Sequence, residues 1–304
     1  MPSAVHLSPE YSYTAIPVER LGRLQGELKA FRDSEELNGF QRWIVDELYD
    51  LRVPQADFAI KSIILVAAPH PLYARVTVSH RGARYHCLSL VSADFEGART
   101  SLEKALGRSS SYLQEAKNLP LKRLAVHCGF ATYGKNNITY IDGYGSSFSY
   151  VAFFSDAPGD NDSWLPVRHD PFCDACQICQ ENCPTGAIRK DRFLIDNARC
   201  LSCLNETAEP FPDWLSPSVH HTLYDCLRCQ IPCPLNKGQA QNIGRDIEFT
   251  EEETDALIAG TGMDAYPETL REKARYLGLD KWPAGIAKNI AALIEARRAK
   301  ATVR

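Results

Sequence analysis

Nine of the eleven cysteines lie between residues 173 and 233, at spacings that suit thiolate ligands of iron. Two runs, C-x2-C-x2-C-x3-C-P and C-x2-C-x3-C-P, contain seven of them: Cys173, Cys176, Cys179, Cys183, Cys226, Cys229 and Cys233. Three thiolates two residues apart on a tight loop can each bind one iron of a 4Fe–4S cubane, whereas the thiolate before the proline points towards another cluster. The spacing therefore predicts two 4Fe–4S clusters and one-electron transfer.

The first run has the spacing of bacterial-type ferredoxins, in which the fourth cysteine serves the other cluster. Crossing the fourth ligands assigns four cysteines to cluster one: Cys173, Cys176, Cys179 and Cys233. Cluster two then takes three cysteines and one of a remaining pair: Cys183, Cys226 and Cys229, with Cys200 or Cys203. The spacing alone leaves that last choice open.

Zinc and disulfides are the alternative uses of these thiols. Structural zinc usually takes paired C-x2-C knuckles, which fit a triple run and two Cys-Pro pairs poorly. The N-terminus lacks the basic and apolar regions of a secretory signal, so we expect a cytoplasmic protein. Reducing conditions there disfavour structural disulfides, and an odd number of cysteines would leave one thiol over.

The composition sets limits on the protein class. The 304 residues are 44% hydrophobic and 24% charged and carry a formal net charge of -4. These values are typical of a globular protein and exclude disordered and fibrous classes. The acidic balance gives no support to broad electrostatic binding of nucleic acid. The longest apolar run, residues 63–68, is the size of a strand and not of a membrane span, so we expect no membrane partner.

Helical and strand patterns alternate in the half of the chain that precedes the cysteines. Apolar periodicity predicts helices over residues 18–51, 98–106 and 121–128, and strands over residues 59–68, 137–141 and 149–154. A hairpin over residues 74–90 turns at Arg81-Gly82. The fold class predicted from this mixture is α+β.

Three domains follow from the same reading. A segment rich in Asp, Pro and Gly, residues 155–168, is the predicted linker. We therefore predict a mixed α/β domain over residues 1–165, a two-cluster ferredoxin-like domain over 166–240 and a short helical extension over 241–304. In the extension, Thr250 and Glu253 have the spacing of a capping box.

Two sequence elements precede the cysteines and carry a family resemblance. Residues 121–137 read LKRLAVHCGFATYGKNN, and Gly143-Tyr-Gly145-Ser146 follows. With the double cysteine run behind them, they resemble the epoxyqueuosine reductase family, in which LAVRAGLGWIGKN is followed by YGS. The resemblance covers residues 60–236. Arg199-Cys200-Leu-Ser matches the RCIS cysteine of that family, so the resemblance favours Cys200 over Cys203 as a ligand.

The resemblance implies a cobalamin in the first domain, which is similar to that of reductive dehalogenases. The clusters would reduce this cobalamin, which then removes the epoxide oxygen of a queuosine precursor in tRNA. Five residues would line the cofactor: Gly134, Lys135, Asn136, Gly145 and Ser146. Two glycine turns and a lysine can present N–H groups and a cation to a phosphate. The alternative is that the glycines only make turns and that Lys135 is solvated.

The chain departs from the family at two candidate catalytic positions. The general acid of the family is an aspartate in a DSAP element, fourteen residues before the glycine that Gly129 matches, and Glu115 stands there. Glu115 is either a proton donor or an ordinary exposed helix residue. Tyr133, beside Thr132 at the aromatic position of GWIGKN, is either a proton donor or a packed side chain.

Seventy residues follow Pro234, too few for the tRNA-reading helical repeats of the family. We therefore expect a small-molecule or nucleoside-like substrate, little support for tRNA, and an external electron donor such as a flavodoxin or ferredoxin. The first hypothesis is a cobalamin-dependent reductase, which the Gly-Lys-Asn and Gly-Ser turns favour. The alternative is an electron-transfer or adaptor protein whose first domain binds a partner in place of cobalamin, which the missing DSAP element favours.

Overall fold

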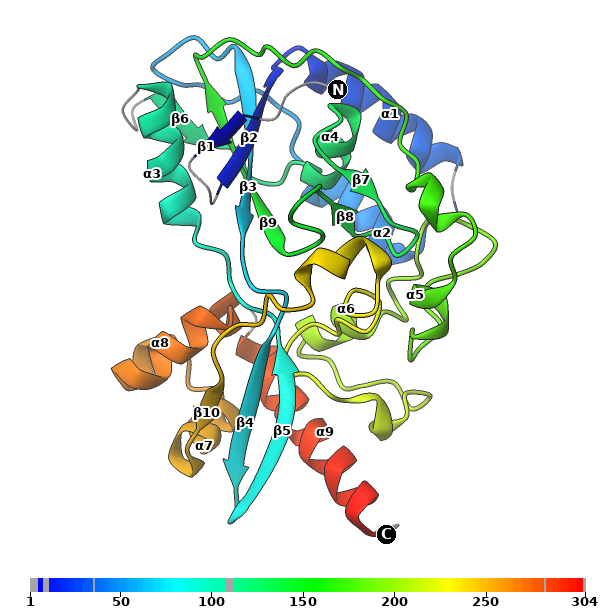
Figure 1. Ribbon diagram of the computed structural model, residues 1–304, viewed down its shortest axis with the longest axis vertical. Helices are drawn as coiled ribbons and strands as arrows, with labels where there is room; N and C mark the ends of the chain where they lie inside the picture. The colour runs from blue at the N-terminus through cyan, green and yellow to red at the C-terminus, as the bar shows by residue number, and fades with distance from the viewer. Residues whose placement is uncertain (1–4, 8–10, 35, 108–111, 282, 303–304) are drawn as a thin grey trace. The chain divides into compact units, whose positions relative to one another are not determined.

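The computed structural model describes residues 5–7, 11–34, 36–107, 112–281 and 283–302. The chain forms two compact units, in which the first comprises residues 1–70 and 93–176 and the second comprises residues 71–92 and 177–304 (Figure 1). These units do not coincide with the three predicted domains, because residues 71–92 leave the first half of the chain to join the second unit.

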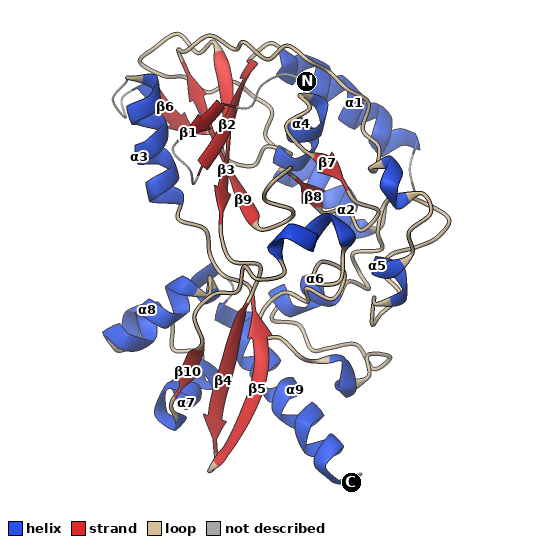
Figure 2. Ribbon diagram, viewed as in Figure 1, coloured by secondary structure: helices blue, strands red, loops and turns tan. Residues whose placement is uncertain are grey.

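The elements of the first unit are, in chain order, β1 (Val5–Leu7), β2 (Tyr11–Pro17), α1 (Arg20–Ser34), α2 (Gly39–Trp43), a π-helical turn (Ile44–Leu48), β3 (Ser62–Pro69), α3 (Phe95–Leu106), β6 (Leu113–Glu115), α4 (Leu121–His127), β7 (Thr132–Tyr133), β8 (Thr139–Tyr140) and β9 (Phe148–Ser155). Those of the second unit are β4 (Ala74–His80), β5 (Ala83–Ser89), α5 (Ile178–Glu181), α6 (Leu201–Glu206), β10 (Ile247–Phe249), α7 (Glu251–Ala259), α8 (Glu268–Tyr276) and α9 (Pro283–Thr302). Figure 2 shows that the cysteine-rich segment is mostly loop with short helical turns. Among the described residues, no helix is long and apolar enough to cross a membrane.

The first unit is built on an antiparallel sheet with the strand order β1-β2-β3-β9-β6. Along β3, Ile63 and Leu65 pack with the apolar residues of α1 and α4, whereas Ile64 and Val66 pack with those of α3. Figure 1 shows α3 on one side of this sheet and α1 with α4 on the other. Because side chains alternate along a strand, two helical layers explain why β3 is apolar at successive positions.

Most of the predicted elements of this unit are confirmed. The strand predicted over residues 59–68 is β3, and the helices predicted over 98–106 and 121–128 are α3 and α4. The helix predicted over 18–51 is interrupted, because Asn38 caps a new helix: its side chain accepts a hydrogen bond from the Gln41 amide at 2.9 Å.

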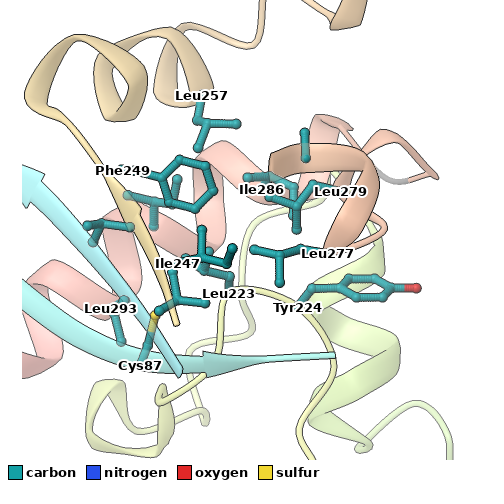
Figure 3. Packing of buried hydrophobic residues seen from close by; sticks show 14 of the residues in the cluster. Cys87, Leu223, Tyr224, Ile247, Phe249, Leu257, Leu277, Leu279, Ile286 and Leu293 are labelled. Carbon is teal, nitrogen blue, oxygen red and sulfur yellow. The ribbon is translucent and has the colours of Figure 1, made fainter. Parts of the chain in front are cut away.

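The second unit holds a three-stranded sheet with the order β10-β4-β5. Strand β10 runs parallel to β4, with Ile247 opposite Val76, and this pairing places the hairpin with the C-terminal half of the chain. Figure 3 shows the core between this sheet and the C-terminal helices, including Phe249 and Leu293. Cys87 lies in this core, where burial raises its pKa to about 12. It is therefore a small apolar residue and not a reactive thiol.

The segment predicted as a linker, residues 155–168, packs on the first unit. Asn161 Nδ2 donates hydrogen bonds to Thr14 Oγ1 at 3.0 Å and to the Cys128 carbonyl at 2.9 Å. The ring of Trp164 stacks on His127 with 4.1 Å between the ring centroids. The first unit consequently continues to Cys176, eight residues beyond the end of the predicted linker at residue 168.

A buried histidine in the second unit makes its stability sensitive to pH. His220 is 5% exposed, with its ring 4.4 Å from that of Phe211, and burial first, then His221 and Lys288, lower its pKa to about 4. Between about pH 6.5 and pH 4 the unfolded chain therefore binds a proton that the folded chain does not. The free energy of unfolding will fall with acid in this range by up to about 1.4 kcal/mol per pH unit.

A His220→Phe variant keeps the ring contact and loses this titration. Urea unfolding of both proteins at about pH 5 and about pH 7.5 should show that the free energy of unfolding falls less on acidification in the variant. An equal fall in the two proteins would assign the effect to other groups.

Candidate functional site

The turn around Cys226 is the best defined part of the second cysteine run. Cys226 is buried between Asp225 and Leu227, which have φ angles of 61° and 62°. Residues other than glycine adopt this left-handed conformation at an energetic cost, so other contacts must hold it. The Asp225 carbonyl accepts hydrogen bonds from Asn205 Nδ2 at 2.8 Å and Thr222 Oγ1 at 2.7 Å. Helix α6 thus fixes the direction in which the Cys226 thiol emerges.

The side chain of Asp225 adds a second contact to α6. Its carboxylate accepts a hydrogen bond from the Ser202 hydroxyl, and burial raises its pKa. Neither Asn205 nor Ser202 was predicted as a site residue. Polar residues of a short helix give no sequence signal of a partner about twenty residues away. Only the position of these two residues between the cysteine runs could have indicated them.

Cys200 and Cys203 lie at the start of α6 and differ in their environment. Cys200 immediately precedes the helix. The Cys203 thiol and the backbone N–H groups of Cys203 and Ser202 donate hydrogen bonds to the Cys200 sulfur, and the thiol contact contributes most to lowering the pKa of Cys200 to about 7. The same contact, with burial, raises the pKa of Cys203. N–H donors at a sulfur favour the thiolate form that iron requires.

The cysteines of cluster two are suited to iron by their donor chemistry. All of the candidates belong to the second unit: Cys183, Cys200, Cys203, Cys226 and Cys229. They carry thiols and form no disulfide in the described chain. Among the described residues, no three His, Cys, Asp or Glu side chains converge on a site for a single ion. A cubane places each thiolate on a different iron, so its ligands need no such convergence.

The loop with Cys173 and Cys176 belongs to the first unit and is supported by the predicted Gly-Lys-Asn element. The Asp170 amide donates to the Tyr133 carbonyl at 2.6 Å. Lys135 Nζ lies 3.3 Å from the Cys176 carbonyl and 3.5 Å from that of Asp174. Lys135 is therefore not simply solvated: it bridges two carbonyls of the cysteine loop.

The five residues predicted to line a cobalamin lie in two neighbouring turns. A Cβ on Gly134 would lie 2.6 Å from both Asn136 Oδ1 and Tyr140 Cε2. A glycine at this position therefore leaves room for these two neighbouring side chains. Asn136 is buried and donates to the Tyr140 hydroxyl at 2.9 Å. Gly145 has a φ angle of 58° and donates to the Ile141 carbonyl at 2.8 Å. These contacts are internal, and the role of the five residues towards a cobalamin stays a prediction.

The second turn nevertheless offers a polar atom to a ligand. Ser146 and Ser147 are both buried, and Ser147 Oγ has no hydrogen-bond partner in the part of the chain that the structure describes. A buried hydroxyl without a partner is uncommon and marks a position where a polar group can bind. The chemistry of this turn therefore fits an amide or phosphate of a cofactor, whereas Gly134 and Asn136 are already engaged within the protein.

The two candidate proton donors lie in different sheets of the first unit. Glu115 is exposed, as one of its two interpretations expected, but it lies at the end of β6, opposite Phe153, and not in a helix. It lines a cavity of about 400 Å³ together with Arg99 and Lys117. Tyr133 is buried in β7, and burial raises its pKa. Its phenol therefore keeps its proton at neutral pH.

The contacts of Lys135 give a testable consequence. A Lys135→Met variant keeps the apolar stem and removes the ammonium that bridges the Cys176 and Asp174 carbonyls. Lys135 is half-buried, and its hydrogen bonds to the loop are long. Because a typical hydrogen bond has a net worth of about 0.5–1.5 kcal/mol, we expect faster loss of iron from cluster one without unfolding. Iron release to a chelator, followed by absorbance, measures this, with Lys122→Met as the matched control. Equal release rates in both variants would show that Lys135 does not support the loop.

Comparison with known proteins identifies the cysteine segment and its relatives. Residues 172–236 match the family described as the 4Fe-4S double cluster binding domain. Epoxyqueuosine reductase of Bacillus subtilis (strain 168) is 30% identical over 127 residues, which are 42% of this chain and 32% of that protein. The enzyme of Burkholderia pseudomallei (strain K96243) is 28% identical over 282 residues, which are 84% of this chain and 68% of that protein. The chain thus spans about a third to two thirds of these curated relatives.

A solved relative corrects one prediction. The crystal structure of epoxyqueuosine reductase with an epoxyqueuosine-modified tRNA-Tyr stem loop matches with a TM-score of 0.60 and 19% identity, over 95% of this chain and 77% of that one. At this identity the match shows the fold. The expectation of a small-molecule or nucleoside-like substrate, with little support for tRNA, is wrong in view of this complex, because overall charge and chain length do not report on a local RNA-binding surface. The predicted resemblance is confirmed: the chain is similar to epoxyqueuosine reductases, and its residues 172–236 match a double 4Fe–4S cluster binding domain.

Proposed function

We propose that this protein is an iron–sulfur reductase that removes the epoxide oxygen of epoxyqueuosine in a tRNA stem loop. The observation that carries the proposal is the match of residues 172–236 to a double-cluster domain within a chain related to epoxyqueuosine reductases. Conversion of an epoxide to an alkene consumes two electrons and two protons and releases water. Two one-electron centres match this requirement.

The proposed ligands follow the crossed arrangement of two-cluster ferredoxins. Cluster one would be held by Cys173, Cys176, Cys179 and Cys233, and cluster two by Cys183, Cys200, Cys226 and Cys229. The N–H groups directed at the Cys200 sulfur and the rigid turn around Cys226 support the second set. Cys203 would then act on Cys200 and not on iron.

Cobalamin is the group that the family resemblance implies next to the substrate. When bound, it supplies a cobalt centre that accepts electrons and delivers them to the epoxide. We propose that Gly145 and Ser146 line it, and the unpartnered Ser147 hydroxyl supports this assignment. Lys135, Gly134 and Asn136 complete the proposed set, although their observed contacts lie within the protein.

Proton delivery is proposed for Glu115 and Tyr133. The reaction needs a group that keeps a proton at neutral pH and gives it to the departing oxygen. The raised pKa of Tyr133 meets this requirement. Glu115 is proposed because it stands at the position of the general acid in the family that the chain resembles. A Glu115→Gln variant with unchanged turnover would dismiss the carboxyl, and Tyr133→Phe tests the phenol in the same way.

The decisive experiment supplies both cofactors and the RNA. Protein reconstituted anaerobically with iron and sulfide, and supplied with cobalamin, is incubated with a reductant and an epoxyqueuosine-modified tRNA stem loop. Mass spectrometry of the nucleosides should show loss of one oxygen, and a Cys226→Ser variant should show none. Corrin that washes off during gel filtration, while about eight irons per chain remain, would favour the electron-transfer or adaptor alternative. Retention of both cofactors without conversion would refute the proposed reaction.

A further inference from the structure

A basic cleft in the second unit lies beside the second cysteine run. The cleft has a volume of about 750 Å³ and is lined by the β4–β5 hairpin, by the segment with Arg228, Ile231 and Pro232, and by α9. Four arginines line it: Arg75, Arg84, Arg228 and Arg297. Among the described residues, only two acidic ones line the cleft, Asp246 and Glu248. The cleft is therefore locally positive in a chain whose formal net charge is -4.

Two of the arginines keep most of their charge available to a partner. Arg228 is exposed and forms no ion pair with any residue that the structure describes. Arg297 donates one hydrogen bond, to the His86 carbonyl at 3.1 Å, and its buried Nε has no partner within the described chain. The pairs Arg75–Asp246 and Arg84–Glu248 are exposed, so water and salt screen them.

Apolar residues also line the cleft. Leu88 from the hairpin and Pro232 from the cysteine segment contribute to it, and Ile231 is 38% exposed. Apolar residues together with arginines are a common composition of protein–protein interfaces. No Phe, Tyr or Trp is among the described lining residues, so unpaired bases could stack only on the rings of His86 and His221 or on the arginine guanidinium groups.

The cleft also touches the loop proposed to hold cluster two. Arg228 lies between Cys226 and Cys229 in the sequence. His221, another lining residue, has its Nε2 2.7 Å from the Cys226 carbonyl oxygen. A protein bound in the cleft would therefore contact Arg228 and His221, which lie next to these cysteines. Electron entry requires such a position beside the cluster.

We propose that this cleft docks an acidic electron-carrier protein of the flavodoxin type and that electrons enter the double-cluster domain there. One electron leaves the reduced flavin of the carrier for each cluster that is reduced, and no covalent bond forms or breaks. Opposite charges raise the rate of encounter, and contact with Leu88, Ile231 and Pro232 stabilises the bound state. The inference needs the double-cluster domain but not the identity of the substrate.

The test compares charge-reversal variants of the reconstituted protein. Arg228→Glu and, from strand β4, Arg75→Glu should each weaken the binding of a purified acidic flavodoxin about tenfold at low salt, measured by surface plasmon resonance, with a smaller effect at high salt. Stopped-flow reduction by the same flavodoxin should slow, whereas reduction by dithionite should keep its rate. Lys190→Glu, an exposed charge in the same segment outside the cleft, is the matched control.

Two results would overturn the inference. Unchanged flavodoxin binding in both variants would exclude the cleft as the docking site. Weakened binding of the tRNA stem loop with unchanged flavodoxin binding would make the cleft an RNA surface. The Arg75→Glu variant, which lies in β4 and not in the cysteine loop, keeps the test valid if Arg228→Glu loses iron. Because flavodoxin binding is measured without RNA, failure of the proposed reaction would leave this result interpretable.

Discussion

Replacing Cys200 by serine will remove about four of roughly eight irons per chain, because cluster two loses one of its four thiolates. Serine keeps the size and the polarity of the side chain, and α6 keeps its start, so the unit will remain folded. Cys200 immediately precedes α6. Its sulfur interacts with the thiol and backbone of Cys203 and with the backbone of Ser202. Iron analysis and electron paramagnetic resonance of the reduced protein measure the loss.

The matched variant is Cys203→Ser, which should keep both clusters. Its hydroxyl can still donate a hydrogen bond to the Cys200 sulfur, so only small changes in the spectrum of one cluster are expected. Full iron in Cys200→Ser together with half of the iron in Cys203→Ser would reverse the assignment. Because both residues lie within the first turn of one short helix, this pair isolates ligand identity from folding.

The sequence was most informative where neighbouring residues determine the outcome. The apolar run of β3 and the hairpin turn at Arg81-Gly82 correspond to the observed elements. The capping box is formed as predicted: the Thr250 amide donates to Glu253 Oε2 at 3.0 Å and the Glu253 amide donates to Thr250 Oγ1 at 3.2 Å. The cysteine spacing likewise predicted a domain that the family comparison confirms.

The sequence was least informative where distant segments meet. Strands β6 and β10 have three residues each, too few for a periodic pattern, and they exist because β9 and β4 provide partners. For this reason the sequence did not reveal that Glu115 ends a short strand, or that the hairpin joins the second compact unit. The basic cleft is another case, because its arginines come from residues 75, 84, 228 and 297 and their convergence is invisible in the net charge.

A buried side chain of α9 bonds to the segments that hold the cluster-two turn. Asn289 is 1% exposed, and its Nδ2 donates to the carbonyls of Asn205 and Leu223, each at 2.9 Å. Asn205 in turn donates to the Asp225 carbonyl beside Cys226. Helix α9, helix α6 and the cysteine turn are therefore linked by one series of hydrogen bonds. Removal of the Asn289 amide takes the donor from both α6 and the segment that leads into the turn.

Replacing Asn289 by leucine will destabilise the second unit and loosen cluster two together. Two buried carbonyls lose their donor, and each unsatisfied group costs about 1–3 kcal/mol. Asn289 Oδ1 has no partner among the described residues, so its removal recovers part of this cost and leaves a net loss of about 2 kcal/mol or more. Urea unfolding should show this loss, and a chelator should remove the iron of cluster two faster than that of cluster one. Glu295→Gln, exposed on the same helix, should change neither quantity. A destabilised Asn289→Leu protein with unchanged iron release would show that α9 supports the core alone and that α6 holds the cysteine turn without it.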